Sequence, residues 1–177
     1  MIDEPRSLRF MVDATGKVFI GLAQLIKELA QEFSAPFFEP HLTLLGGITG
    51  DTAKIVGQCE KLCDFQRPFE IRLAEPGHLD DYYRSLFLHV ARSPALLHAN
   101  RQARKVLECS ENGNYFHHVS LLYGNYPLKL KRSIVAGRVA GMNGTFSADR
   151  FFLIDLAGGP QDWTRIASFL FRKQHRL

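Results

Sequence analysis

Two short segments of this 177-residue chain place a histidine two residues before a hydroxyl side chain, within a run of strand-forming residues. His41 precedes Thr43 in PHLTLL, and His118 precedes Ser120 in HHVSLLYG. Residues i and i+2 of a strand point to the same face, so each segment presents an imidazole and a hydroxyl together. Polar groups in such apolar strands are costly to bury unless they bond to something. We therefore interpret both pairs as parts of a functional site.

Two imidazoles and two hydroxyls that meet in one groove could hydrolyse a phosphodiester. One histidine with a pKa near neutrality can take a proton from water, while the other protonates the leaving oxygen on the opposite side of the phosphorus. The hydroxyls of Thr43 and Ser120 can donate hydrogen bonds to the non-bridging phosphate oxygens. This chemistry requires no metal, and no Cys/His grouping has the spacing of a zinc site, so we expect neither metal nor cofactor.

The alternative for any single histidine is an ordinary place in the core or at a strand edge. For His41 and His118 this alternative needs two coincidences, because both precede a hydroxyl and both occupy the same place in a repeat. We keep the ordinary interpretation for the remaining histidines, which are His78, His89, His98, His117 and His175.

The elements that must position these residues are predicted twice in the same order. The first copy comprises a strand from residue 7, a helix over 17–33, a strand from 40, a helix over 52–63 that Asp51 can cap, and a strand over 69–77. The second copy comprises a strand from residue 85, a helix over 94–108, a strand over 117–124, a helix over 128–141 and a strand from 151. Residues 163–172 alternate enough for a last strand, with a short helix as the alternative.

We interpret this order as an internal duplication, and two such copies are expected to pack about a pseudo-twofold axis. The predicted fold is α+β, with two pseudo-symmetric ferredoxin-like lobes whose antiparallel sheets line a shared groove and whose helices lie outside. We expect a single bilobal domain over residues 1–177, with lobe-forming repeats at approximately 7–77 and 85–158. Both His-x-hydroxyl pairs then face the same groove.

Composition restricts the class of protein. No apolar run approaches the roughly 18 residues that a membrane span needs, and the N-terminal MIDEPRSLRF lacks the regions of a secretory signal, so we expect a cytoplasmic protein. The net charge of +4 suits anionic substrates but falls short of a dedicated DNA-binding surface. Cys59, Cys63 and Cys109 are expected to be thiols rather than disulfide partners. We expect a monomer.

PHLTLL at residues 40–45 and HHVSLLYG at 117–124 resemble the two H-x-[ST] motifs of the 2H phosphoesterase superfamily. Together with YYRSLFL, they look most like its cyclic phosphodiesterase branch. The resemblance implies metal-independent hydrolysis of a cyclic phosphodiester, such as a nucleoside 2',3'-cyclic phosphate or ADP-ribose 1'',2''-cyclic phosphate, to a phosphomonoester. It implies that His41 and His118 are the acid/base pair and that the two hydroxyls bind phosphate. In plant-like members the second histidine activates water and the first protonates the leaving oxygen.

A nucleoside substrate also needs an aromatic surface near the phosphate. Tyr123 ends the second motif's strand, and the resemblance places an aromatic residue there near the substrate. The segment GHLDDYYRS at 77–85 offers Tyr82, Tyr83 and Arg84 for stacking or phosphate contacts. Packing at the lobe interface is the alternative for the two tyrosines of this segment.

Two other functions remain open. The first is an RNA-end phosphodiesterase, either an RNA 2',3'-cyclic phosphodiesterase or a 3' exonuclease, with the same paired histidines acting on RNA ends. It would need a basic track leading from the groove, and the moderate charge argues against one. The second is a non-catalytic nucleotide- or RNA-binding module. The two complete motifs argue against it, because a protein that has lost its activity usually loses one of them.

Overall fold

The structure, a computed structural model, describes residues 7–109 and 115–172, so His175 lies outside the described residues. Its strands are β1 (Leu8–Asp13), β2 (His41–Ile48), β3 (Phe69–Gly77), β4 (Leu86–Val90), β5 (His118–Leu122), β6 (Thr145–Ala148), β7 (Arg150–Asp155) and β8 (Thr164–Leu170). Its helices are α1 (Gly16–Phe33), α2 (Thr52–Phe65), α3 (Pro94–Val106) and α4 (Leu128–Ile134). Shorter turns are η1 (Tyr82–Arg84), η2 (Val135–Val139) and η3 (Pro160–Asp162).

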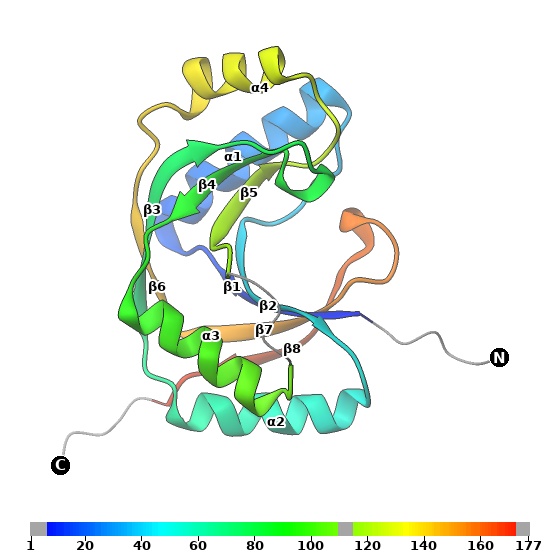
Figure 1. Cartoon of the computed structure of the whole chain (residues 1–177), viewed down its shortest axis with the longest axis vertical. Helices are drawn as coiled ribbons and strands as arrows, with labels where there is room; N and C mark the ends of the chain where they lie inside the picture. The colour runs from blue at the N-terminus through cyan, green and yellow to red at the C-terminus, as the bar shows by residue number, and fades with distance from the viewer. Residues whose placement is uncertain (1–6, 110–114, 173–177) are drawn as a thin grey trace.

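The strands form one eight-stranded sheet in the order β6-β3-β4-β5-β2-β1-β7-β8, in which every neighbouring pair is antiparallel. The sheet curls, with α1 and α4 outside one end of it and α2 and α3 outside the other (Figure 1). The predicted α+β class, with antiparallel strands and outer helices, is confirmed. No helix in the described ranges is long and apolar enough to cross a membrane.

Local sequence patterns account for most of these elements. In α1 the residues Leu22, Ile26 and Leu29 recur at helical spacing and are buried against the sheet. The helix α2 begins where predicted, because the Asp51 carboxylate accepts a hydrogen bond from the Lys54 backbone N–H at 2.7 Å. The C-terminal segment forms β8, so its alternation correctly predicted a strand.

The sequence repeats do not correspond one to one with the two halves of the sheet. The third strand of the first repeat, β3, pairs with β4 of the second repeat. The third strand of the second repeat, β7, pairs with β1 of the first. Each half of the sheet therefore contains one strand from the other repeat, and this exchange ties the two halves together. The middle of the strand order lies between β5 and β2, which is where the expected pseudo-twofold axis would pass.

Two details differ from the sequence prediction. The edge strand β6 was not predicted, because its four residues are too few to show a clear alternation. The helix predicted over 128–141 is α-helical only to Ile134 and continues as the π-helical turn η2. Gly137 lies in this turn, and glycine weakens a regular helix.

Candidate active site

The two halves of the sheet meet between the two motifs. The register between β2 and β5 contains the pair Leu42–Val119, and each of these residues is the middle one of its motif. Since the pairing is antiparallel, His41 lies on the Ser120 side of this pair and Thr43 lies on the His118 side. The two imidazoles thus occupy one diagonal and the two hydroxyls the other. Diagonal neighbours in a regular ladder are about 7–8 Å apart, enough room for a phosphoryl group between the imidazoles.

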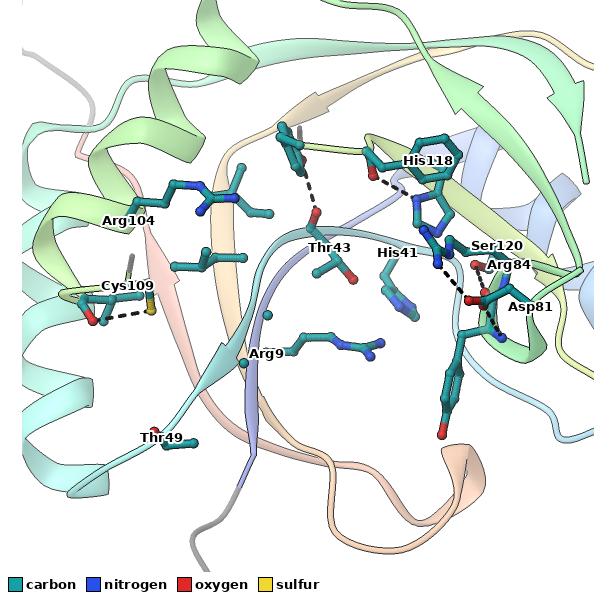
Figure 2. Close-up of a pocket in the computed structure, with 18 of the residues that line it drawn as sticks. Arg9, His41, Thr43, Thr49, Asp81, Arg84, Arg104, Cys109, His118 and Ser120 are labelled. Atoms are coloured by element: carbon teal, nitrogen blue, oxygen red, sulfur yellow. Dashed lines mark hydrogen bonds and ion pairs between the residues drawn. The ribbon is translucent and has the colours of Figure 1, made fainter. Parts of the chain in front are cut away.

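A cavity of about 710 Å³ lies over this junction and is lined by all four motif residues. Figure 2 shows them arranged around one open space, together with side chains from β1 and from the segment that includes η1. Cavities of several hundred cubic ångströms hold small ligands in other proteins, so the volume suits a nucleotide. The structure therefore brings together the residues that the sequence singled out as the acid/base pair and the phosphate ligands.

Both histidines are oriented in the same way. The Nδ1 atom of His41 lies 2.7 Å from the carbonyl oxygen of Glu39, and that of His118 lies 2.9 Å from the carbonyl oxygen of Phe116. A carbonyl oxygen only accepts hydrogen bonds, so each Nδ1 carries the proton and donates it. Each neutral ring then has an unprotonated Nε2, which is the atom available to exchange a proton with a ligand.

Burial lowers the pKa of both imidazoles. Desolvation is the main cause of a His41 pKa of about 4, and the positive charge of Arg9 and a charged His118 lower it further. Desolvation is also the main cause for His118, whose pKa is lowered less, with contributions from Arg84 and Arg9. Both histidines are thus neutral near pH 7 in the free protein. A bound anion must raise one pKa before that imidazole can act as an acid.

The two hydroxyls differ in their surroundings. Ser120 is buried, and its Oγ donates a hydrogen bond to the carbonyl oxygen of Tyr83 at 3.0 Å. The side chain of Thr43 faces the cavity, while its carbonyl oxygen accepts a hydrogen bond from the Tyr115 hydroxyl at 3.0 Å. The Ser120 hydroxyl has one proton, so it must turn away from Tyr83 before it can donate to a phosphate oxygen.

The aromatic residues predicted to contact the substrate have different positions. Tyr123 lines the cavity, but its ring is 2% exposed and stacks on Phe38 with the ring centroids 3.9 Å apart. Burial raises the pKa of Tyr123 to about 12, and this ring has no free face for a nucleobase. Tyr83 also lines the cavity and is 43% exposed, so it does offer a face, whereas Tyr82 is not part of the lining.

Arg84, which was predicted to contact the substrate, lines the cavity but already has partners within the protein. Its Nη2 donates a hydrogen bond to the Asp81 carboxylate at 2.7 Å, and its guanidinium lies 5.7 Å from the Phe116 ring centroid. The same carboxylate accepts hydrogen bonds from the backbone N–H groups of Tyr83 and Arg84, each at 3.0 Å. Arg84 is therefore part of the structure that holds η1 in place.

Two residues of the site were not predicted from the sequence. Arg9, on β1, lines the cavity and extends into it below His41 (Figure 2). Trp163 precedes β8, and its ring centroid lies 6.2 Å from that of His41 and 6.3 Å from that of Tyr83. An arginine inside the apolar strand LRFMVD was a signal for the first, and nothing local marked the second.

The structure gives no group of three or more His, Cys, Asp or Glu side chains positioned to share a metal ion, as far as residues 7–109 and 115–172 are concerned. Cys59, Cys63 and Cys109 are free thiols, as expected. Burial raises the pKa of Cys59 and that of Cys63 to about 12. These two thiols are neutral at physiological pH and lie away from the cavity lining.

Comparison with known proteins assigns the family. Residues 21–160 match the model of the 2'-5' RNA ligase superfamily. The chain belongs to this superfamily, that of the 2H phosphoesterases, and the family expected from the two motifs is confirmed. A cyclic phosphodiesterase of Arabidopsis thaliana is 26% identical over 112 residues, which are 62% of this chain and 61% of that protein. The matched region is less than two thirds of the length of this relative.

Solved structures of low sequence identity share the fold. The Escherichia coli LigT complex with ATP covers 96% of this chain and 100% of its own, with a TM-score of 0.65 at 16% identity. The LigT complex with 3'-AMP covers the same shares, with a TM-score of 0.65 at 18% identity. The TT0787 protein of Thermus thermophilus also covers 96% of this chain and 100% of its own, with a TM-score of 0.70 at 18% identity.

Proposed function

We propose that this protein hydrolyses a cyclic phosphodiester to a phosphomonoester by acid/base catalysis with His41 and His118 and without a metal. The observation that carries the proposal is the Leu42–Val119 pair, because it sets the two imidazoles diagonally across one cavity. Substrates are a nucleoside 2',3'-cyclic phosphate or ADP-ribose 1'',2''-cyclic phosphate. The curated cyclic phosphodiesterase relative supports this class. Because both repeats contribute to the site, we also propose that the chain acts as a single bilobal domain.

The reaction needs one neutral and one protonated imidazole. The neutral imidazole takes a proton from water through Nε2 while the water oxygen forms a bond to phosphorus. The ring P–O bond on the opposite side breaks, and the protonated imidazole gives its proton to the departing oxygen. The hydroxyls of Thr43 and Ser120 donate hydrogen bonds to the non-bridging oxygens as charge builds on them.

The surroundings of the two imidazoles favour one distribution of these roles. His41 has the lower pKa, so a pair that holds one proton keeps it on His118 in the free protein. This distribution favours His41 as the base and His118 as the acid, the reverse of the roles that the resemblance to plant-like members implies. The orientation of the bound ester makes the final choice, because each imidazole can serve only the oxygen on its own side of the phosphorus.

The nucleoside is expected to lie against Tyr83 and Trp163 rather than Tyr123. The exposed ring of Tyr83 lines the cavity, and the Trp163 ring lies nearly parallel to it, at an interplanar angle of 27°. Aromatic rings at a cavity wall stabilise a nucleobase by stacking. The complexes of LigT with ATP and with 3'-AMP support a nucleotide-sized ligand for this fold.

Phosphorus NMR of the purified protein in EDTA tests the proposal. The assay offers 2',3'-cyclic AMP, ADP-ribose 1'',2''-cyclic phosphate and an RNA oligonucleotide that ends in a cyclic phosphate. We expect turnover of a small cyclic ester, and we expect His41→Ala and His118→Ala each to lower kcat by at least about 10². His98→Ala, on the exposed face of α3, is the matched control and should keep the wild-type rate.

Three outcomes would redirect the assignment. Near-normal turnover by either alanine variant would contradict paired-histidine catalysis. Turnover of the oligonucleotide alone would favour the RNA-end phosphodiesterase, and no turnover of any substrate would favour a binding module. Activity that is lost in EDTA and restored by one divalent ion would contradict the metal-independent mechanism.

A further inference from the structure

We propose that Arg9 is a catalytic residue that contacts the non-bridging oxygens of the reacting phosphoryl group and stabilises their negative charge. This inference rests on the proposed function. A cyclic phosphodiester carries one negative charge, and attack by water places more charge on its oxygens in the transition state. A fixed cation beside the two imidazoles would lower that barrier most effectively in a site shielded from water.

The strand arrangement directs Arg9 into the cavity. Its neighbours Leu8 and Phe10 are completely buried in the core, while Arg9 lines the cavity with both histidines. The Arg9 side chain crosses β2 at Gly46, where its Cγ and Nε lie 3.7 and 3.8 Å from the position that a Cβ atom would take. These are ordinary van der Waals distances, so the stem of Arg9 packs along the backbone of β2 at this place. Figure 2 shows the Arg9 guanidinium ending below the His41 ring, at the side of the four motif residues.

The contacts of Arg9 orient its charge without neutralising it. The guanidinium carbon lies 5.1 Å from the ring centroid of Trp163 and 5.8 Å from that of Tyr83. No carboxylate of the described residues forms an ion pair with Arg9. The other cavity arginine at this end, Arg84, has a carboxylate partner at 2.7 Å. Aromatic faces hold a guanidinium in place and leave its N–H groups free to donate to an anion.

The influence of Arg9 on its neighbours agrees with this position. Its positive charge lowers the pKa of His41 and also that of His118, so the guanidinium lies close enough to act on both imidazoles. A phosphoryl group held between those imidazoles would therefore experience the same positive charge. Arginine can meet two phosphate oxygens with parallel hydrogen bonds, which suits a group whose charge is spread over its oxygens.

The test compares Arg9→Met, Arg9→Lys and the charge-matched control Arg101→Gln, on the exposed face of α3. Methionine keeps apolar packing against the two aromatic rings but removes the charge, and circular dichroism checks that each variant folds. With 2',3'-cyclic AMP we expect Arg9→Met to lower kcat by about 10² to 10³. Arg9→Lys should recover part of the rate, and Arg101→Gln should keep all of it.

A pH profile separates a catalytic charge from a purely structural role. Without the Arg9 charge, the limbs of the kcat/KM profile that report the histidines should move to higher pH in Arg9→Met, whereas Arg9→Lys, which also changes the packing but keeps a positive charge, should keep them near the wild-type position. A wild-type kcat in Arg9→Met would overturn the inference. A rise in KM with unchanged kcat would also overturn it, because Arg9 would then bind another part of the substrate equally in the ground and transition states.

A binding measurement tests the Arg9 contact even if the proposed hydrolysis does not occur. If the wild-type protein hydrolyses no cyclic ester, binding of adenosine 2'-monophosphate to wild type and to Arg9→Met can be compared by calorimetry. Tighter binding by the wild type would support Arg9 as the contact to the phosphoryl group in a site without turnover. Equal binding by the two proteins would overturn that contact.

Discussion

The pH dependence of catalysis should differ between the free protein and its substrate complex. Burial lowers the pKa of His41 to about 4 and also lowers the pKa of His118. The kcat/KM profile follows the ionisation of the free enzyme, with one limb set by the base and the other by the acid. We therefore expect both limbs, and the optimum between them, below the ordinary histidine pKa of about 6.5.

The bound phosphate should largely reverse this shift. A negative charge about 4 Å from an imidazolium stabilises it by about 4 kcal/mol at an effective dielectric constant of about 20. Since about 1.4 kcal/mol corresponds to one pKa unit, this attraction raises a histidine pKa by as much as about 3. Both imidazoles would experience this attraction, so His118, the expected acid, should keep its proton to a higher pH in the complex than in the free protein. The basic limb of kcat, which reports the complex, should therefore lie well above that of kcat/KM.

Initial rates with 2',3'-cyclic AMP from about pH 4 to pH 9, at constant ionic strength, give both profiles. The profile at low substrate concentration yields kcat/KM, and the profile at saturation yields kcat. A basic limb of kcat/KM at or above about pH 6.5 would show that the imidazoles are not desolvated in the free protein. Identical limbs in the two profiles would show that the bound anion does not restore the catalytic proton.

Three other predictions concern stability, substrate binding and the roles of the histidines. The His41 pKa is about 4 in the folded protein and 6.5 when unperturbed, so protonation favours unfolding between these values. As the pH falls from 6.5 to about 4, the wild type should lose about 3 kcal/mol of unfolding free energy relative to His41→Gln. Urea unfolding of both proteins measures this difference, and a difference that does not change with pH would contradict the prediction. Trp163→Ala should raise KM for 2',3'-cyclic AMP by about tenfold with little change in kcat, and an unchanged KM would exclude Trp163 from nucleobase binding. Nitrophenolate is a good leaving group, so a nitrophenyl phosphodiester needs no general acid. We therefore expect His118→Ala, which lacks the acid, to hydrolyse this ester at near the wild-type rate, and His41→Ala to be slow. The opposite result would restore the roles implied by the resemblance.

The sequence was a good guide to individual elements because each carries a local signal. The apolar spacing of α1 and the cap at Asp51 depend only on nearby residues, and both were predicted. The exchange of β3 and β7 between the repeats was not predicted, because alternation in a strand says which face is buried and not which strand lies beside it. The short edge strand β6 has too few residues to show alternation.

The contrast between local signals and tertiary neighbours also explains which site residues could be predicted. The motif residues could be predicted to share a face because positions i and i+2 of a strand always do. The roles expected of Tyr123 and Arg84 depended on tertiary partners that the sequence could not show, namely Phe38 stacked on the tyrosine and Asp81 paired with the arginine. Trp163 lies beside His41 and Tyr83 only because β7 and β8 lie beside β1 in the sheet.

The duplication that we infer from the sequence would explain why the site has two similar halves with different surroundings. Both imidazoles are held by the same local device, a carbonyl oxygen two residues earlier in the chain. Their neighbours come from different elements: the His41 ring lies edge-on to Trp163, and the His118 ring lies against Phe116. Acid/base catalysis needs one protonated and one neutral group, and different surroundings favour one of the two ways of placing the single proton. The repeated motif thus fixes the orientation of the rings, while the unrepeated neighbours set the difference in pKa between them.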